Sequence, residues 1–262
     1  LIIAPREHGK TDQLAIGRVL WELGRNPQLR IKIVCQDDDH AAQRLVAVEG
    51  QIERNPRVRQ VFPKLLPHPA LDNWSKHTAT VARKGEDKDP SVEALGVMSA
   101  GTGGRADLIV FDDVVDLRNA IQLPALREAV KTAIRNVWLN LLTKNGRAVY
   151  VATPWHEDDA THDMEQIRTW VCLKQPIPES LESIWWEQWP RTRLEQRREE
   201  IGERAFARGF FLRALSDEDT PFRNITACIR PDLSRLHIKD HWPRFTGVDL
   251  GHSKRKDQQR GS

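Results

Sequence analysis

The sequence contains few cysteines, little net charge and no long apolar run. Its three cysteines, Cys35, Cys172 and Cys228, lie far apart without paired spacing, which argues against a zinc site and fits a reducing compartment. Because no apolar run approaches membrane-spanning length and no signal peptide is visible, we expect no membrane association. The net charge of +3, with both signs mixed along most of the chain, is only a weak indication of a nucleic-acid partner.

The composition of the 262 residues is that of a soluble globular protein. With 39% apolar and 29% charged residues, the chain can bury one large core, or one domain plus part of another. Short apolar segments predict strands over 1–4, 31–35, 92–98, 108–111 and 148–152, and helical spacing predicts helices over 12–23, 39–54 and 123–142. This alternation predicts an α/β fold with a mainly parallel sheet and helices on both faces.

The stretch LIIAPREHGKT at the start of the chain has the context of a phosphate loop. An apolar strand precedes Gly9, Lys10 and Thr11, and a helical pattern follows them. Backbone N–H groups at a helix N-terminus attract phosphate, while Lys10 would reach the outer phosphates and Thr11 would hold Mg²⁺. The alternative is a helix capped by a chance Gly-Lys-Thr. The predicted nucleotide-binding residues are Ala4, which replaces the first glycine of the usual pattern, and Pro5, Arg6, Glu7, His8, Gly9, Lys10 and Thr11.

Two aspartates follow the strand predicted over 108–111, in the sequence DLIVFDD. Ligands gather at the carboxyl ends of strands in open α/β sheets, so we expect Asp112 to support Mg²⁺ there. Asp113 is then placed to orient or deprotonate the attacking water, with nearby Asp116 as the alternative base. Both strand-end aspartates could instead cap the following segment.

An arginine beside the γ-phosphate would stabilise the charge of the transition state. Arg105 is presented by the glycine-rich turn GTGGR and could act in its own subunit or on a neighbour, whereas Arg6 in the loop is the competing residue. The turn could also be a plain hairpin with a solvated arginine. Thr153, at the end of the strand over 148–152, could sense phosphate and transmit hydrolysis to the next segment. We interpret the His- and Asp-rich residues 156–163 as a solvated helix start rather than a metal site.

The character of the sequence changes after about residue 169. The segment IWWEQWP precedes a highly charged helix predicted over 192–207. We interpret Trp185, Trp186 and Trp189 as packing at a domain junction rather than stacking on bases. The last predicted element, FTGVDLG, is a short strand that ends in an acidic residue.

In this order the motifs resemble the large terminase subunit of tailed bacteriophages. The resemblance rests on the APREHGKT loop, the GTGGR turn leading into LIVFDD, and the VATPWHEDD segment, and it extends from residue 1 to about 257. The order of these motifs is more specific than any one of them. FTGVDLG is similar to the first strand of that family's ribonuclease-H-like nuclease domain, where Asp249 matches a metal-binding carboxylate and Asp257 a further acidic position.

The resemblance implies an ATPase that uses ATP and Mg²⁺ to move double-stranded DNA into a procapsid in the host cell cytoplasm. Its implied partners are a homo-oligomeric ring of the same chain, the portal protein and the small terminase subunit. Mg²⁺ or Mn²⁺ would serve the nuclease of a complete chain. The implied roles are ATP and Mg²⁺ binding for Lys10 and Thr11, metal support for Asp112, the catalytic carboxylate (usually Glu) for Asp113, the loop arginine for Arg6, the inter-subunit finger for Arg105, and coupling for Thr153.

The resemblance also divides the chain into three parts. These are an ASCE-type P-loop ATPase core over 1–175, a linker subdomain over 176–243, and the start of a truncated RNase H-like nuclease domain over 244–262. The family's adenine-binding segment lies upstream of the phosphate loop and the remaining nuclease ligands lie downstream, so we expect no DNA cleavage by this chain as given. Two other functions stay open: a helicase-like nucleic-acid-dependent ATPase, and a nucleotide-binding scaffold without turnover.

Overall fold

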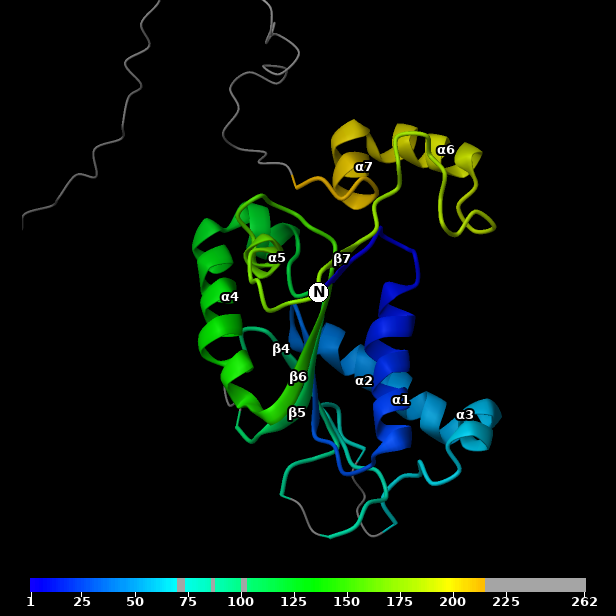
Figure 1. Ribbon diagram of the computed structural model, residues 1–262, viewed down its shortest axis with the longest axis vertical. Helices are drawn as coiled ribbons and strands as arrows, with labels where there is room; N and C mark the ends of the chain where they lie inside the picture. Colours follow the sequence, from blue (N-terminus) through cyan, green and yellow to red (C-terminus); the bar gives the residue numbers. More distant parts are fainter. Residues whose placement is uncertain (70–73, 86–87, 100–102, 215–262) are drawn as a thin grey trace, which may run out of the picture. The chain divides into compact units, whose positions relative to one another are not determined.

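Seven strands form one sheet, in the order β3-β4-β2-β5-β6-β1-β7, in the part of the chain that the computed structural model describes: residues 1–69, 74–85, 88–99 and 103–214 (Figure 1). Neighbouring strands pair in parallel, except that β3 is antiparallel to β4. The predicted α/β fold with a mainly parallel sheet is therefore confirmed. The strands are β1 (Ile2–Ile3), β2 (Ile31–Cys35), β3 (Thr78–Ala79), β4 (Val92–Gly96), β5 (Ala106–Asp112), β6 (Leu142–Ala152) and β7 (Leu173–Lys174).

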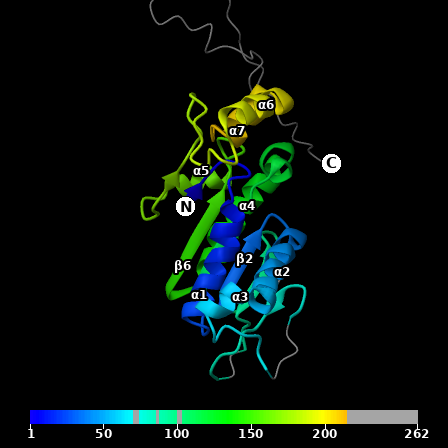
Figure 2. The same cartoon turned by 90° about the vertical axis from the view of Figure 1, so that its right-hand side faces the viewer.

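Helices cover both faces of this sheet, and the side-chain alternation of β5 explains why. Leu108 and Val110 pack into one core with α1 (Arg18–Arg25) and α2 (Asp38–Arg54). Ile109 and Phe111 point to the opposite face and pack into a second core with α4 (Pro124–Asn136) and α5 (Ala160–Glu165). Figures 1 and 2 show these two helical layers on either side of the strands. A strand buried on both faces has no polar alternation, as the sequence of β5 shows.

The ends of several helices follow from local sequence signals. The helix after the phosphate loop starts with a π-helical segment, Thr11–Gly17, and continues as α1. The Asp37 carboxylate accepts the backbone N–H of His40 at 2.8 Å and so caps α2. Proline is the first residue of α3 (Pro56–Val61) and of α4, where its missing N–H costs nothing.

The predicted helix over 123–142 is too long at its C-terminal end. Helix α4 ends at Asn136, a 3-10 turn covers Trp138–Leu141, and β6 begins at Leu142. The indole of Trp138 is fully buried and donates to the carbonyl of Val97 at 2.9 Å, which fixes the chain where it turns into the strand. Leucines on both sides of this turn continue the apolar pattern, so periodicity alone did not reveal the boundary.

A third, smaller core holds the segment that follows the sheet. It contains Trp189, which precedes the short helix α6 (Arg191–Ile201), and Phe206 of the short helix α7 (Glu203–Gly209). The single helix predicted over 192–207 is wrong, because Gly202 has a φ of +79° and separates the two. Trp189 is buried, whereas Trp185 and Trp186 are 40% and 67% exposed, and packing of the three tryptophans at a domain junction stays a prediction.

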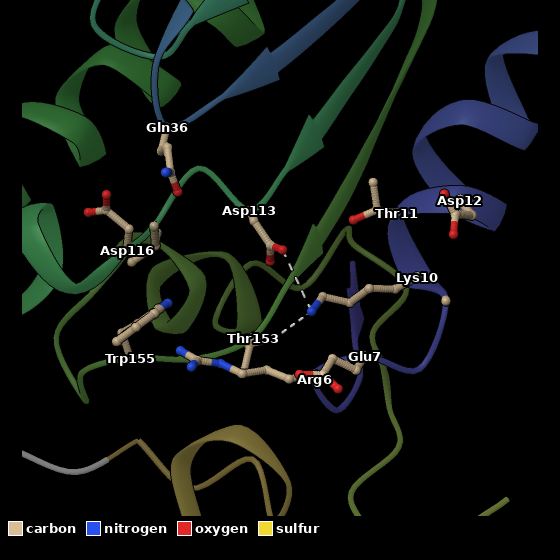
Figure 3. Close-up of a pocket in the computed structure, with 12 residues that line it drawn as sticks. Arg6, Glu7, Lys10, Thr11, Asp12, Gln36, Asp113, Asp116, Thr153 and Trp155 are labelled. Atoms are coloured by element: carbon tan, nitrogen blue, oxygen red, sulfur yellow. Dashed lines mark hydrogen bonds and ion pairs between the residues drawn. The ribbon is translucent and has the colours of Figure 1, made fainter. Parts of the chain in front are cut away.

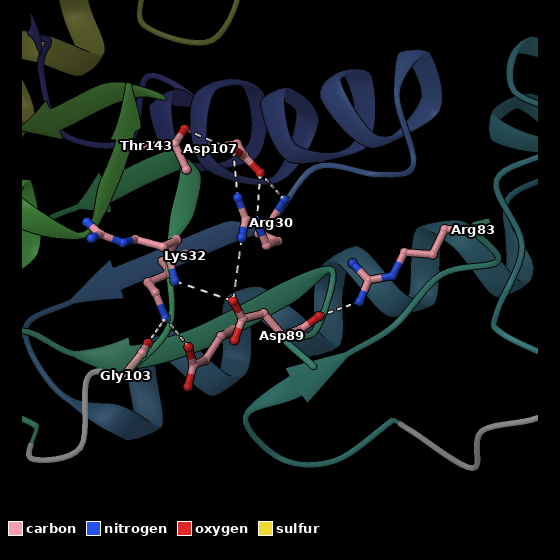
Figure 4. A network of polar contacts seen from close by, with 9 residues as sticks. Arg30, Lys32, Arg83, Asp89, Gly103, Asp107 and Thr143 are labelled. Atoms are coloured by element: carbon pink, nitrogen blue, oxygen red, sulfur yellow. Dashed lines mark hydrogen bonds and ion pairs between the residues drawn. The ribbon is translucent and has the colours of Figure 1, made fainter. Parts of the chain in front are cut away.

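A polar network connects the amino-terminal ends of four strands (Figure 4). Arg30 pairs with Asp107 at 3.0 Å, and Thr143 donates to the same carboxylate at 3.0 Å. Lys32 is buried beside Glu93 and donates to the carbonyl of Gly103 at 3.0 Å. These contacts join the starts of β2, β4, β5 and β6, at the edge opposite to the phosphate loop.

The C-terminal predictions fall outside the described residues. They include residues 215–243 of the linker subdomain and the nuclease strand with Asp249 and Asp257, and the domain limits at 175 and 243 stay predictions. Among the helices that are described, none combines the length and apolar character needed to cross a bilayer.

Candidate functional site

A pocket of about 430 Å³ lies at the carboxyl ends of β1, β2, β5 and β6 (Figure 3). Strand β6 lies between β1 and β5, so the phosphate loop after β1 and the acids after β5 face each other across one strand. This edge is where ligands bind in open parallel sheets. The pocket is lined by Arg6, Glu7, Gly9, Lys10, Thr11, Asp12, Gln36, Asp113, Val115, Asp116, Thr153 and Trp155.

The loop after β1 turns twice through left-handed backbone. Glu7 has a φ of +57° and Gly9 a φ of +72°. Glycine adopts this conformation at little cost, whereas Glu7 needs tertiary contacts to hold it there. The indole of Trp189 supplies one such contact, because its Nε1 donates to the carbonyl of Glu7 at 3.1 Å.

Three of the predicted loop residues shape the loop and do not line the pocket. The N–H of Ala4 continues the sheet by donating to the carbonyl of Ala152 at 3.3 Å. Ala4 has no positive φ, which explains how alanine can replace the first glycine of the pattern. The His8 ring stacks on Trp189 with centroids 5.6 Å apart, and burial lowers the pKa of His8. Pro5 lies between Ala4 and the lining residue Arg6.

Lys10 connects the ends of three strands. Its side chain is 8% exposed, and Nζ donates to Thr153 Oγ1 at 2.7 Å. The same Nζ lies 3.6 Å from Asp113 Oδ2 (Figure 3). The loop lysine, the acid after β5 and the threonine after β6 therefore form one contiguous polar group.

Asp112 lies beneath the pocket and is fully buried. Thr11 Oγ1 donates to Asp112 Oδ1 at 3.2 Å, and Arg44 Nε of α2 donates to Asp112 Oδ2 at 2.8 Å. Burial raises the pKa of Asp112, as does the neighbouring charge of Asp113, while Arg44 opposes both effects. The Arg44 pair thus favours the ionised carboxylate that a cation needs.

Asp113 faces the pocket with a side chain that is 35% exposed. Its backbone N–H donates to the carbonyl of Val151 at 3.0 Å, and its φ is +47°. Aspartate and asparagine are enriched in left-handed backbone, whereas a longer side chain gains nothing there. This conformation gives a physical reason for an aspartate at position 113, where the family that the sequence resembles usually has glutamate.

Asp116 also lines the pocket but is tied to the chain that follows. Its Oδ1 accepts the N–H of Asn119 at 2.7 Å, and Asn119 Oδ1 accepts the N–H of Asp116 at 2.8 Å. This reciprocal pair fixes the start of the π-helical segment Arg118–Gln122. The two acids thus differ in setting: Asp113 contacts Lys10, and Asp116 caps a helix.

The two arginines considered for charge stabilisation lie at opposite ends of the strands: Arg6 at the carboxyl ends and Arg105 at the amino ends. Arg6 lines the pocket and stacks its guanidinium 4.3 Å from the ring centre of Trp155. Arg105 precedes β5 and donates to the carbonyl of Asn140 at 3.2 Å. At about 3.3 Å per residue, the length of β5 puts Arg105 roughly 25 Å from Asp113. A role of Arg105 in hydrolysis would therefore have to be at the pocket of another subunit.

The segment after Thr153 is anchored by Asp159, which belongs to the helix start that we interpreted as solvated; for this residue that interpretation is wrong, because its side chain is buried. Asp159 is fully buried and accepts backbone N–H groups of Trp155, His156 and His162 at 2.8, 3.0 and 3.0 Å. Burial raises the pKa of Asp159, against the opposing effect of these hydrogen bonds. The carboxylate thus caps α5 and fixes the chain that carries Thr153 and Trp155.

Replacing Asp159 by alanine is expected to lower the free energy of unfolding by about 2–4 kcal/mol, because several buried donors lose their acceptor. Urea denaturation measures this loss. The control is Asp158→Ala. Asp158 is 54% exposed, and its buried partner Lys131 keeps Glu128 and Asp163, so we expect a loss of about 1 kcal/mol or less. Equal losses for the two variants would contradict the anchoring role.

The oxygen atoms of Thr11 and Asp112 fit a magnesium ion that completes its coordination with phosphate and water. Mg²⁺ prefers oxygen ligands and takes one or two carboxylates beside substrate phosphates. Within the described ranges, no group of three or more His, Cys, Asp or Glu side chains is arranged to hold a metal. A cation here would therefore depend on the phosphates for much of its coordination.

The structure adds residues to the site that the sequence did not indicate. Gln36 directly follows β2, so its place at a strand end was a usable signal. Asp12 follows the predicted loop by one residue, and Trp155 follows Thr153 by two. Arg44 lies on the buried side of α2, and nothing in its local sequence connects it to Asp112.

Together, the fold and the pocket define an α/β domain whose candidate site lies at the carboxyl ends of parallel strands. No family model matches the chain. The chain is 29% identical over 180 residues to the "Terminase, large subunit" of Enterobacteria phage T3, which covers 68% of this chain and 28% of that protein. The sequence match thus confirms the resemblance to phage large terminase subunits, although the chain spans only 28% of this relative.

The crystal structure of the large terminase of bacteriophage HK97 has a similar fold. The TM-score is 0.53 at 15% sequence identity, and the match covers 81% of this chain and 46% of the HK97 chain. At this identity the match is evidence for the fold alone. The resemblance to large terminase subunits therefore rests on the sequence match to the phage T3 protein, and the HK97 structure agrees in fold.

Proposed function

We propose that this chain is the ATPase part of a phage large terminase subunit, which couples ATP hydrolysis to the movement of double-stranded DNA into a procapsid. The observation that carries the proposal is the 3.2 Å hydrogen bond between Thr11 of the phosphate loop and Asp112 at the end of β5. This contact brings both nucleotide motifs, which lie about a hundred residues apart, to one pocket. An ATPase needs this arrangement, whereas chance motif matches have no reason to meet.

The mechanism that we propose depends on positioning and electrostatics. The amides around Gly9 would cradle the phosphates, and Lys10 would contact the outer ones. Thr11 and Asp112 would hold Mg²⁺, which when bound neutralises charge between the phosphates. Asp113 would orient the attacking water and accept its proton. Arg6, which already lines the pocket, would stabilise charge on the terminal phosphate.

The partners proposed for this function are those of a packaging motor. They are double-stranded DNA, further copies of the chain in a ring, the portal protein and the small terminase subunit, in the host cell cytoplasm. A nuclease that includes Asp249 belongs to the same proposal for a complete chain. Each of these is a proposal for the whole protein, because the chain spans only 28% of the phage T3 relative.

Phosphate release by the purified chain tests the proposal most directly. We expect turnover of ATP that requires Mg²⁺, stops with EDTA and increases when linear double-stranded DNA is added. Nucleotide binding without turnover would favour a scaffold instead. Stimulation by single-stranded DNA with strand separation would favour a helicase-like ATPase. If the chain neither binds ATP nor hydrolyses it, the proposed nucleotide site is refuted.

Mixing variants tests the role of Arg105. If Arg105 serves the pocket of a neighbouring subunit, then Arg105→Ala protein added to wild type should lower ATPase activity more than simple dilution does. Arg57→Ala, which removes another exposed arginine on α3, is the control and should cause no loss. A loss proportional to dilution would contradict action between subunits and leave Arg6 as the stabilising residue.

A further inference from the structure

The C-terminal end of helix α7 lies directly against the phosphate loop. The backbone N–H of Arg6 donates to the carbonyl of Gly209 at 3.0 Å, and a Cβ at Gly209 would lie 3.2 Å from Arg6 Cδ. Figure 3 shows the gold ribbon of α7 below Arg6. Glu7 adds a second tie, because its carboxylate accepts from Arg197 of α6 at 3.2 Å. The small α6–α7 subdomain thus contacts two consecutive residues of the loop.

Two guanidinium groups meet one indole ring at this contact. The Cζ of Arg6 lies 4.3 Å from the ring centre of Trp155, and the Cζ of Arg208 lies 5.7 Å from it. Arg208 is 7% exposed, so α7 places a buried positive charge behind Trp155, a residue that lines the pocket. Cation–π contacts with a shared ring fix the two side chains relative to each other.

The two guanidinium charges repel each other in this partly buried place. Burial lowers the pKa of Arg6, Asp113 opposes this effect, and the charge of Arg208 lowers the pKa further. An anion beside the pair relieves the repulsion, and a guanidinium binds phosphate oxygens through two parallel hydrogen bonds. The pair therefore favours a phosphate in the adjoining pocket, and favours it more as the charge of that phosphate increases.

We propose that Arg208 is a positioning residue that acts through Arg6 and Trp155 to make the pocket distinguish a nucleoside triphosphate from a diphosphate. This inference rests on the proposed function. Arg6 shares the pocket with Lys10 and Asp113, the residues expected beside the outermost phosphate, so the charge of Arg208 reinforces binding at that phosphate. The α6–α7 subdomain thereby contacts the loop at the place where ATP and ADP differ.

Equilibrium binding of ATP and ADP to the full chain, with Mg²⁺, tests this role. Arg208→Gln should lower the ratio of ATP to ADP affinity by about tenfold, while the ADP affinity changes less than about threefold. Arg208→Lys keeps the charge and should retain most of the ratio. Arg204→Gln changes an exposed arginine on the same helix and should leave the ratio unchanged. In an Arg6→Gln background, Arg208→Gln should have little further effect, because Arg208 acts through Arg6.

The outcomes separate this inference from the proposed function. Wild type that binds neither nucleotide would overturn both. Wild type that binds both, together with an Arg208→Gln variant whose ratio is unchanged or whose two affinities fall equally, would overturn the role of Arg208 alone. Because Arg208 is buried, the thermal stability of each variant is measured as a control for folding. If Arg208→Gln does not fold, Arg208→Met keeps a long unbranched side chain without charge and is expected to show the same tenfold loss.

Discussion

Replacing Lys10 by alanine is expected to lower ATP turnover by at least about 100-fold. The lysine is buried, and its ammonium is the positive charge that contacts both Asp113 and Thr153. Among the described residues that line the pocket, Arg6 is the other arginine or lysine, and its guanidinium stacks on Trp155. Steady-state phosphate release at saturating ATP measures the change, and equilibrium binding shows how much nucleotide affinity is also lost.

A matched control for this prediction is Lys144→Ala. Lys144 is an exposed lysine on β6, the strand that ends beside Lys10, and its removal should leave turnover within about twofold of wild type. Thermal unfolding of both variants separates lost chemistry from lost structure. Equal phosphate release by wild type and Lys10→Ala, with nucleotide still bound by wild type, would mean that the chain binds nucleotide without hydrolysing it.

Replacing Asp113 by asparagine is expected to lower turnover by about 100-fold or more while ATP still binds, because general-base catalysis typically contributes this much. Asparagine is suited to this test, since it tolerates the φ of +47° as well as aspartate does. It also removes the charge 3.6 Å from Lys10 without changing the size of the side chain. Single-turnover hydrolysis with prebound ATP isolates the chemical step.

The comparison variant is Asp116→Asn. An asparagine oxygen can still accept the N–H of Asn119, so the helix cap is retained and turnover should fall by less than about tenfold. If Asp116→Asn instead loses more activity than Asp113→Asn, then Asp116 is the base. The two substitutions are chemically identical, so the difference between them reports position alone.

The parts of the fold and the site that the sequence predicted are those with a local signal. The strand before the loop, Lys10, Thr11 and the aspartates after β5 follow from short-range patterns. Strand β2 has the predicted limits, because its apolar residues end in polar ones on both sides. The parallel sheet then brings these strand ends together without further information.

The remaining features depend on contacts between residues far apart in sequence. Arg44 reaches Asp112 only because α2 packs beside β5, and Arg208 reaches Trp155 only because α7 folds back onto the loop. No periodicity encodes either contact. For Arg105 the sequence left action in its own subunit and on a neighbour open, and the length of β5 places it far from the pocket of its own chain.

The side-chain ammonium of Lys10 contacts both Asp113 and Thr153, and this shared contact has a consequence for the order of events. Whatever anion draws Lys10 toward itself competes with both partners at once. The Asp113 carboxylate then loses its neighbouring ammonium group, and Thr153 Oγ1 loses the hydrogen bond from Lys10 in the same step. In the proposed ATPase, phosphate binding would therefore change the contacts of the acid at the end of β5 and of the threonine after β6 together.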